Sequence, residues 1–140
     1  MLEKDFEDIL EIHPYLLDPS FKKYKTLRQK KIRKGRVDLF LISDDNLNIV
    51  IIEIKRDKLI LSSLSQIKRY YYYFRRKYKG TNIIISAYLV GTSSNLDISR
   101  LKWLKIKLID KDIPRKIKLC PKCNTAFDYK VFTCKCGFRV

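Results

Sequence analysis

Two apolar, β-branched segments joined by a short polar turn limit the folds open to this chain more than any other feature. Residues 37–42 (VDLFLI) and 48–55 (NIVIIEIK) read as strands, and the Ser-Asp-Asp-Asn stretch between them favours a hairpin. A hairpin that is symmetric about Asp45 and Asn46 pairs residues whose numbers add up to 91. Asp38 then lies opposite Glu53, and a shift of one residue in the turn would separate them.

An acid and a lysine end the second of these strands. Side chains alternate across a strand, so Glu53 and Lys55 point to the same face of the sheet. The carboxylates of Asp38 and Glu53 repel each other unless a divalent cation lies between them. Such a cation lowers the pKa of a bound water and neutralises charge on a phosphate oxygen, as phosphodiester hydrolysis requires. Lys55 would orient or deprotonate that water or stabilise the phosphorane; the alternative is an ordinary salt bridge between Lys55 and one acid.

The remaining segments predict a small α/β domain. Residues 62–79 read as a helix capped by Ser62 or Ser63, which places Gln66 and Tyr70 on one face. The other expected elements are a helix over 2–17 limited by Pro14, an edge strand over 24–33, a turn at 34–35, a buried strand over 81–91, a short helix over 96–104 and a closing strand over 106–109. The order αβββαβαβ with a mixed central sheet is typical of an α/β core.

The charge of the chain indicates a polyanionic partner. Its 31 basic residues outnumber its 15 acids, for a net charge of +16, and residues 19–37 hold nine cations and no acid. The helix predicted over 62–79 carries a second basic cluster. A solvated, Lys-rich surface is the alternative, but such surfaces carry Glu in matching numbers. We therefore expect DNA as the partner, with candidate contacts at Lys30, Lys31, Arg33, Lys34, Arg36, Lys68 and Arg69.

Several aromatic residues and the single histidine have competing interpretations. The run Tyr70–Tyr73 covers every face of its predicted helix, so some rings belong to the core while one or two could stack on bases or sugars. Trp103 is expected in the core. His13 precedes a proline at a predicted helix end, which favours a packing or capping role over catalysis.

Four cysteines near the C-terminus predict a structural metal site. Cys120, Cys123, Cys134 and Cys136 form a Cys-x-x-Cys pair and a Cys-x-Cys pair, and four thiolates satisfy tetrahedral Zn²⁺. Two disulfides are the alternative. The arrangement resembles a zinc ribbon, although the second pair is shorter than usual. We expect a linker at 111–118 between a domain over 1–112 and a zinc-ribbon module over 113–140, which could bind a partner protein.

Four segments together carry a resemblance to a known family. Residues 6–10 (FEDIL), 35–39 (GRVDL), 50–56 (VIIEIKR) and 66–70 (QIKRY) occur in the order seen in RecB-like members of the PD-(D/E)xK nuclease superfamily. More closely, they resemble the nuclease domain of the archaeal NucS/EndoMS mismatch endonucleases. The resemblance extends over residues 3–110.

This resemblance implies a restriction-endonuclease-like fold and a DNA endonuclease that uses Mg²⁺ or Mn²⁺. It makes Asp38 and Glu53 metal ligands and Lys55 the catalytic lysine. It also places Glu7 at the metal site from a helix, although Glu7 could be a solvated helix acid. It makes Gln66 and Tyr70 supports of the site or contacts to the DNA backbone, although both could be ordinary helix surface and core.

The type of DNA stays open at this stage. The resembled endonucleases carry a further N-terminal domain for dimerisation and DNA binding, whereas this sequence starts at the nuclease domain, so mismatch, junction or flap DNA are equally consistent with it. A homodimer is compatible with the sequence. A non-catalytic nucleic-acid-binding module with a nuclease fold is the alternative function. No secretory signal or apolar run of about 18 residues occurs, so we expect a soluble, cytoplasmic protein of an archaeal or virus-infected cell.

Overall fold

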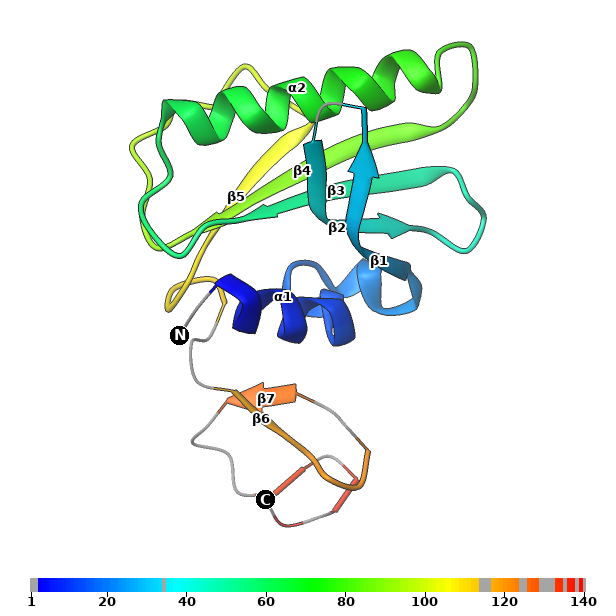
Figure 1. The fold of residues 1–140 in the computed structure, drawn as a ribbon. Coiled ribbons are helices and arrows are strands. Elements are labelled where there is room, and N and C mark those ends of the chain that lie inside the picture. Colours follow the sequence, from blue (N-terminus) through cyan, green and yellow to red (C-terminus); the bar gives the residue numbers. More distant parts are fainter. Residues whose placement is uncertain are drawn as a thin grey trace.

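The computed structural model of the chain contains one five-stranded sheet with helices on both faces (Figure 1). It describes residues 3–33, 35–113, 117–123, 126–128, 133–134, 136–137 and 139. The elements of the main domain are α1 (Glu3–Ile12), β1 (Lys25–Ile32), β2 (Gly35–Ile42), β3 (Asn48–Ile54), α2 (Leu61–Lys77), β4 (Ile84–Gly91) and β5 (Leu104–Leu108), with short 3₁₀ turns η1 (Pro14–Leu16) and η2 (Pro19–Lys23) after α1.

The sheet is mixed, as predicted. Its strand order is β1-β2-β3-β4-β5; β1, β2 and β3 pair antiparallel, while β4 and β5 add on in parallel. In the β2–β3 hairpin, the pairs from Leu39↔Ile52 to Ile42↔Ile49 have residue numbers that add up to 91. The predicted hairpin register is therefore confirmed, and so is the prediction that residues 24–33 contribute an edge strand.

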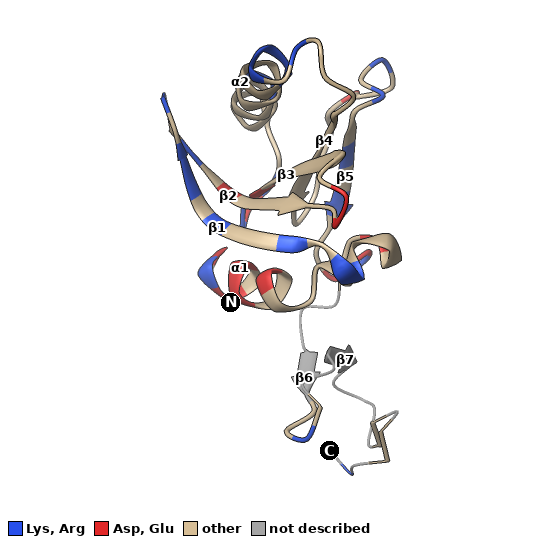
Figure 2. Ribbon diagram, turned by 90° about the vertical axis from the view of Figure 1, so that its right-hand side faces the viewer, with Lys and Arg blue, Asp and Glu red and all other residues tan. Residues whose placement is uncertain are grey.

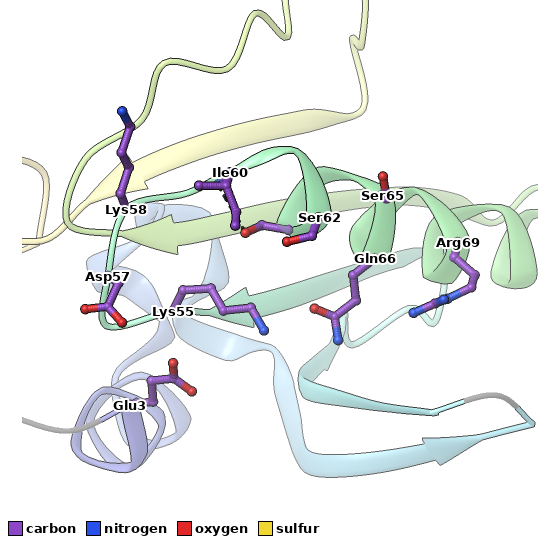
Figure 3. Close-up of a pocket in the computed structure, with 10 residues that line it drawn as sticks. Glu3, Lys55, Asp57, Lys58, Ile60, Ser62, Ser65, Gln66 and Arg69 are labelled. Atoms are coloured by element: carbon purple, nitrogen blue, oxygen red, sulfur yellow. Dashed lines mark hydrogen bonds between the residues drawn. The ribbon is translucent and has the colours of Figure 1, made fainter.

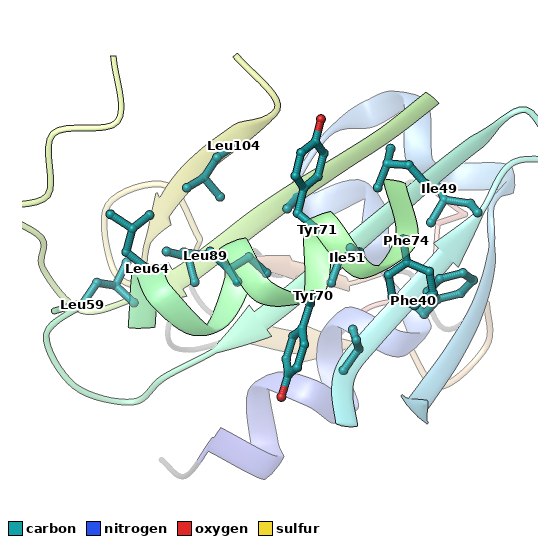
Figure 4. Close-up of a cluster of buried hydrophobic side chains, with 14 residues drawn as sticks. Phe40, Ile49, Ile51, Leu59, Leu64, Tyr70, Tyr71, Phe74, Leu89 and Leu104 are labelled. Carbon is teal, nitrogen blue, oxygen red and sulfur yellow. The ribbon is translucent and has the colours of Figure 1, made fainter. Parts of the chain in front are cut away.

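Alternating side chains of β3 divide the core into two layers. Ile49 and Ile51 pack under α2, where Phe40 and Phe74 lie 5.2 Å apart between ring centroids (Figure 4). Val50 and Ile52 belong to the cluster on the opposite face, under α1 and the 3₁₀ turns. Because both faces of β3 are covered, the strand is almost entirely apolar until Glu53.

The N-terminal helix is shorter than the predicted span of 2–17. It ends at Ile12, and the chain continues as the 3₁₀ turn η1 from Pro14. Proline disfavours the helical conformation in the residue before it, which explains the break after Ile12. Phe6 and Leu10 are fully buried against the sheet, so the apolar stripe that predicted the helix is its packing face.

The predicted helix over 96–104 is wrong. The chain between β4 and β5 is irregular, with a turn closed by Leu101 N–H donating to the Ile98 carbonyl at 2.9 Å. Leu96 and Ile98 both pack against the α2-side core, as does Trp103. Apolar residues two apart fit an extended segment better than a helix. The observed order of the domain is therefore αβββαββ.

Two smaller expectations also change. The N-cap of α2 is Ile60, not Ser62 or Ser63; the Ser63 hydroxyl instead accepts a hydrogen bond from the Ile60 N–H at 3.3 Å. Of the predicted turn at 34–35, Lys34 lies outside the described residues. Residues 114–116 of the predicted linker do so as well.

The C-terminal segment contains a second, two-stranded sheet. Strands β6 (Ile117–Leu119) and β7 (Ala126–Asp128) pair antiparallel, so the predicted linker already ends where β6 begins. Among the described helices, none is both long and apolar enough to cross a bilayer.

Candidate active site

Asp38 lies where β2 passes the end of β3. Its Oδ2 accepts a hydrogen bond from the Ile54 N–H at 2.8 Å, and its own N–H donates to Oε1 of Glu53 at 3.2 Å. The pKa of Asp38 is raised because the carboxyl is buried, although the Ile54 N–H and the Lys55 ammonium act in the opposite direction. The hairpin register thus brings the two acids together, as predicted.

Glu53 is the more deeply buried of the two acids. Its side chain follows the apolar run of β3 and is only 2% exposed. Burial and repulsion from Asp38 raise its pKa to about 8. A buried carboxyl in this state is unfavourable as an anion unless a positive charge comes close to it.

Glu7 reaches the same region from α1 on the other side of the sheet. It is 9% exposed, and its pKa is raised by burial, with Asp38 adding repulsion and the Gln29 amide and Arg28 opposing the rise. Arg28 Nε lies 3.8 Å from its Oε1. Glu7 is therefore held at the site and is not a freely solvated helix acid.

Gln29, which the sequence reasoning missed, connects two of these carboxylates. Its Nε2 donates to Oε1 of Glu7 and lies 3.4 Å from Oδ1 of Asp38. The backbone φ of Gln29 is +51°, and the β1–β2 pairing skips this position between Arg28 and Lys30. Left-handed backbone in a non-glycine residue is uncommon and concentrates at functional sites. Only one sequence feature could have pointed to Gln29. If β1 and β2 form a hairpin, the Gln29 side chain lies opposite Asp38.

Lys55, the residue directly after β3, lines a cleft beside α2. In Figure 3 its ammonium points toward Gln66. The cleft, about 620 Å³ in volume, is lined by Glu3, Lys55, Asp57, Lys58, Ile60, Ser62, Ser63, Ser65, Gln66 and Arg69. We call it the active-site cleft. Of Asp38, Glu53 and Lys55, Lys55 is the residue that lines this cleft.

Gln66 and Tyr70 contact each other on α2. Gln66 Nε2 donates to the Tyr70 hydroxyl at 3.2 Å. Tyr70 is 2% exposed and packs in the core, and a Cβ built at Gly35 would lie only 2.6 Å from its hydroxyl. Gln66 therefore faces the cleft, while Tyr70 holds α2 against the start of β2 (Figure 4).

Basic residues from both predicted clusters meet over the sheet. A hollow of about 460 Å³ between the β1–β2 hairpin and α2 is lined by Ile32, Arg33, Arg69, Tyr73, Arg76 and Lys77. We call it the hairpin–helix hollow. Lys31 and Arg36 are also exposed on the hairpin, and Lys30 lies with its Nζ 5.2 Å from the centroid of the Phe40 ring. Figure 2 shows this basic stretch along β1. Lys34 lies outside the described residues.

The acids fit a divalent cation by their chemistry. Oxygen ligands suit Mg²⁺ and Mn²⁺, and a cation beside the two carboxyls would offset the burial and mutual repulsion that raise their pKa values. Among the described residues, the four cysteines are the one group of three or more His, Cys, Asp or Glu side chains close enough to share a metal ion. The protein would thus supply two close carboxylates, with Glu7 further out.

The four cysteines form a separate candidate metal centre. Their sulfur atoms all lie within 4.8 Å of one another, with Cys120 and Cys136 at 3.6 Å and Cys123 and Cys134 at 3.3 Å. None of the four is joined in a disulfide, so the structure contains neither of the two disulfides considered as an alternative. Tetrahedral Zn²⁺ with bonds of about 2.3 Å separates its sulfur ligands by roughly 3.8 Å. The cluster is close to that size.

The family follows from comparison with known proteins. A family model described as the endonuclease NucS C-terminal domain matches residues 2–119. The chain belongs to the NucS C-terminal domain family. It is 32% identical over 109 residues to endonuclease NucS of Sulfurisphaera tokodaii, covering 77% of this chain and 40% of that protein. Against endonuclease NucS of Methanocaldococcus jannaschii it is 33% identical over 123 residues, covering 83% and 46%.

Solved structures of the NucS type share the fold. A repair endonuclease from Pyrococcus abyssi superimposes with a TM-score of 0.62 and 27% identity, over 77% of this chain and 46% of that one. An EndoMS–dsDNA complex gives a TM-score of 0.60 and 25% identity, over 76% and 44%. The chain thus spans less than half the length of each of these relatives. The NucS family match ends at residue 119, directly before the first cysteine.

Proposed function

We propose that this chain is a divalent-metal-dependent DNA endonuclease of the PD-(D/E)xK type, acting on structured DNA such as a mismatch, a junction or a flap. The observation that carries the proposal is the contact between Asp38 and Glu53 in a member of the NucS C-terminal domain family. Two buried carboxyls with raised pKa values are costly for stability, and a hydrolytic metal site gives them a role.

Each polar residue then has a part in the chemistry. Asp38 and Glu53 would hold Mg²⁺ or Mn²⁺, which when bound lowers the pKa of water and offsets phosphate charge. Lys55, directly after β3, would orient or deprotonate the attacking water or stabilise the phosphorane. Glu7 would support the site from α1 through Gln29. Gln66 would contact the DNA backbone or Lys55 in the cleft.

The DNA would approach over the active-site cleft and the hairpin–helix hollow. Both are lined by cations, and they share Arg69. Phosphate contacts from Arg and Lys position a nucleic acid without reading its sequence. The basic residues of β1, β2 and α2 therefore favour a nuclease that recognises DNA shape more than base sequence.

The C-terminal residues 113–140 would form a zinc-ribbon module beside the nuclease domain of residues 1–112. Four thiolates leave no open position on Zn²⁺, so the metal would stabilise the module and take no part in hydrolysis. The module would bind DNA or a partner protein. Its strands β6 and β7 contain three residues each, too few to be stable without such a crosslink.

One experiment tests the function directly. Purified protein is incubated with single-stranded, duplex, mismatched, flap and four-way-junction DNA, each with Mg²⁺, with Mn²⁺ and with EDTA. We expect metal-dependent cleavage of at least one structured substrate, lost in Glu53→Gln. Tight binding of the same substrates without cleavage under any metal condition would overturn the enzyme and support the non-catalytic binding module.

A further inference from the structure

A third hollow lies further along and around α2, toward its C-terminal end. Its volume is about 610 Å³, within the range of pockets that hold small molecules. Its lining is either aromatic or basic throughout: Tyr71, Tyr72, Trp103, Arg75, Arg76 and Lys79. We call it the aromatic hollow. None of the roles proposed above uses it.

The aromatic side chains that line this hollow pack against one another. Tyr71 stacks on Trp103 with ring centroids 3.8 Å apart and an interplanar angle of 3°. Tyr72 stands across both rings, at 66° to Tyr71 and 64° to Trp103. Arg75 donates from Nη1 to the Tyr71 hydroxyl at 3.2 Å, with its guanidinium 5.8 Å from the ring centroid. The Tyr72 side chain is nevertheless 49% exposed, so aromatic surface remains open to solvent.

This chemistry suits a nucleotide whose base is unpaired. Every base has a π-face that stacks on an aromatic ring, but a duplex hides those faces inside its own stack. Arg75, Arg76 and Lys79 are exposed around the rings and supply positive charge for phosphates. Among the described residues, three cations and no carboxylate line the hollow, so its charge favours an anionic ligand over a cationic one. We infer that the aromatic hollow binds an unpaired nucleotide of a nucleic-acid strand, with its base on Tyr72 and Trp103.

The position of the hollow connects it with the proposed nuclease site. Arg69 lines both the active-site cleft and the hairpin–helix hollow, and Arg76 lines both the hairpin–helix hollow and the aromatic hollow. Along α2, the ten residue steps from Gln66 to Arg76 span about 15 Å. That distance equals roughly four or five nucleotide steps at a spacing of about 3.4 Å, that of a strand in duplex DNA. The placement of the unpaired nucleotide relative to Lys55 rests on the proposed function, whereas binding at the hollow does not.

Trp103 makes the inference directly measurable, because it is the single tryptophan of the chain. The full-length Glu53→Gln protein, which cannot cleave, is titrated with an oligothymidylate of roughly 12 nucleotides and with a duplex of equal length. We expect the single strand to quench Trp103 fluorescence and the duplex to quench it far less. Binding of fluorescently labelled strands is followed in parallel by anisotropy.

Matched variants separate stacking from charge. Tyr72→Ala should weaken single-strand binding by about fivefold or more, while Tyr72→Phe keeps the ring and should bind as the parent does. Arg75→Gln with Arg76→Gln should reduce the salt dependence of binding. Lys22→Gln with Lys23→Gln removes the same charge from the α1 side of the sheet and should leave the quenching unchanged.

The outcomes distinguish this inference from the proposed activity. Strand binding without quenching of Trp103, equal quenching by duplex, or full affinity in Tyr72→Ala would each overturn the aromatic hollow as a nucleotide site. If the wild-type protein nevertheless cleaves DNA, the proposed nuclease activity is still supported. Quenching and Tyr72 dependence without any cleavage by the wild-type protein supports the hollow and contradicts the nuclease.

Discussion

The backbone N–H of Asp38 donates to Oε1 of Glu53 across the β2–β3 hairpin at 3.2 Å. The same turn that sets the register from Leu39↔Ile52 onward therefore sets the distance between the two acids. A slip of one residue would turn Glu53 away from Asp38 and exchange the side chains that β3 packs into the two core layers. Fold stability and the arrangement of the site are thus secured by one structural feature.

The first prediction separates activity from stability. Glu53→Gln removes a proposed metal ligand and should lower the cleavage rate by more than about a hundredfold. Loss of a residue that only supports a metal ligand typically costs less than that. It also removes the repulsion from Asp38, so without metal at pH 8 the variant should melt no lower than the wild type. Cleavage rates and thermal melts measure both effects. Asp57→Asn, an exposed acid that lines the same cleft, is the control and should retain activity.

A second prediction concerns pH in the absence of metal. The pKa of Glu53 is raised to about 8 in the folded protein, against an ordinary value of 4.5. Between these values the folded state holds a proton that the unfolded state has lost, so stability should fall as pH rises from about 4.5 toward about 8. Glu53→Gln should flatten this decline, and Mg²⁺ should raise the melting temperature of the wild type most at pH 8. Identical pH profiles for both proteins would contradict the raised pKa.

Gln29 gives a third prediction. Its amide holds Glu7 and approaches Asp38, while its backbone is in the left-handed region. Gln29→Gly accepts that backbone without strain but lacks the amide, so Mg²⁺ affinity and cleavage should fall by about tenfold while stability is kept. Isothermal titration of Mg²⁺ and a melt measure the two quantities. Gln29→Asn, which also tolerates this backbone but is one carbon shorter, should give an intermediate loss.

Much of the sheet, and the grouping of Asp38, Glu53 and Lys55, could be predicted because both depend on short-range patterns. The turn between β2 and β3 fixes the register, and the sequence spacing puts Glu53 and Lys55 at neighbouring positions at the end of β3. Gln29 was missed because its role depends on α1 crossing the end of the sheet, which no local pattern specifies. The tyrosine run was ambiguous for a related reason: Tyr70 became core and Tyr72 stayed exposed according to where β2 and Trp103 pack.

The errors have a physical cause as well. The segment 96–104 has enough apolar residues for a helix, but they face the core two apart, and the Asp97 side chain accepts from the Ser99 N–H at 3.0 Å in a local turn. Side-chain bonds of this kind compete with helix formation. Trp103, expected in the core, lies at its rim because its ring stacks on Tyr71 from the loop before β5.

The fourth prediction concerns the basic surface. Arg33 and Arg69 come from opposite sides of the hairpin–helix hollow, one on the hairpin and one on α2. If DNA lies over this hollow, Arg33→Gln with Arg69→Gln should weaken binding to all sequences alike and lower the slope of log affinity against log salt by about two for duplex DNA. Fluorescence anisotropy at several salt concentrations measures this slope. A loss confined to certain sequences would indicate base reading and contradict phosphate tracking.

The last prediction concerns the cysteine cluster. The four thiol sulfurs lie within 4.8 Å of one another. The Cys136 N–H lowers the pKa of Cys134, but desolvation and the neighbouring thiols outweigh it and raise that pKa to about 12. A thiolate is favoured here only when a cation is bound, so the purified protein should contain one zinc per chain. Cys120→Ser with Cys123→Ser should abolish zinc binding, as measured by elemental analysis. Absence of zinc from the wild-type protein, or pairing of these cysteines as disulfides under reducing conditions, would overturn the assignment.

The same variant also tests whether the cluster acts apart from the nuclease site. The NucS family match ends at residue 119, and the carboxylates belong to β2 and β3, whose packing involves none of the cysteines. Loss of zinc should therefore leave Mg²⁺-dependent cleavage and the melting of the main domain unchanged, while affinity for the preferred DNA falls. A protein shortened after Ile113 should behave in the same way, because it keeps all five strands of the main sheet and the fully buried Ile113 side chain of the α1-side core. Complete loss of cleavage in a Cys120→Ser, Cys123→Ser protein that still folds would show instead that the cluster takes part in the chemistry.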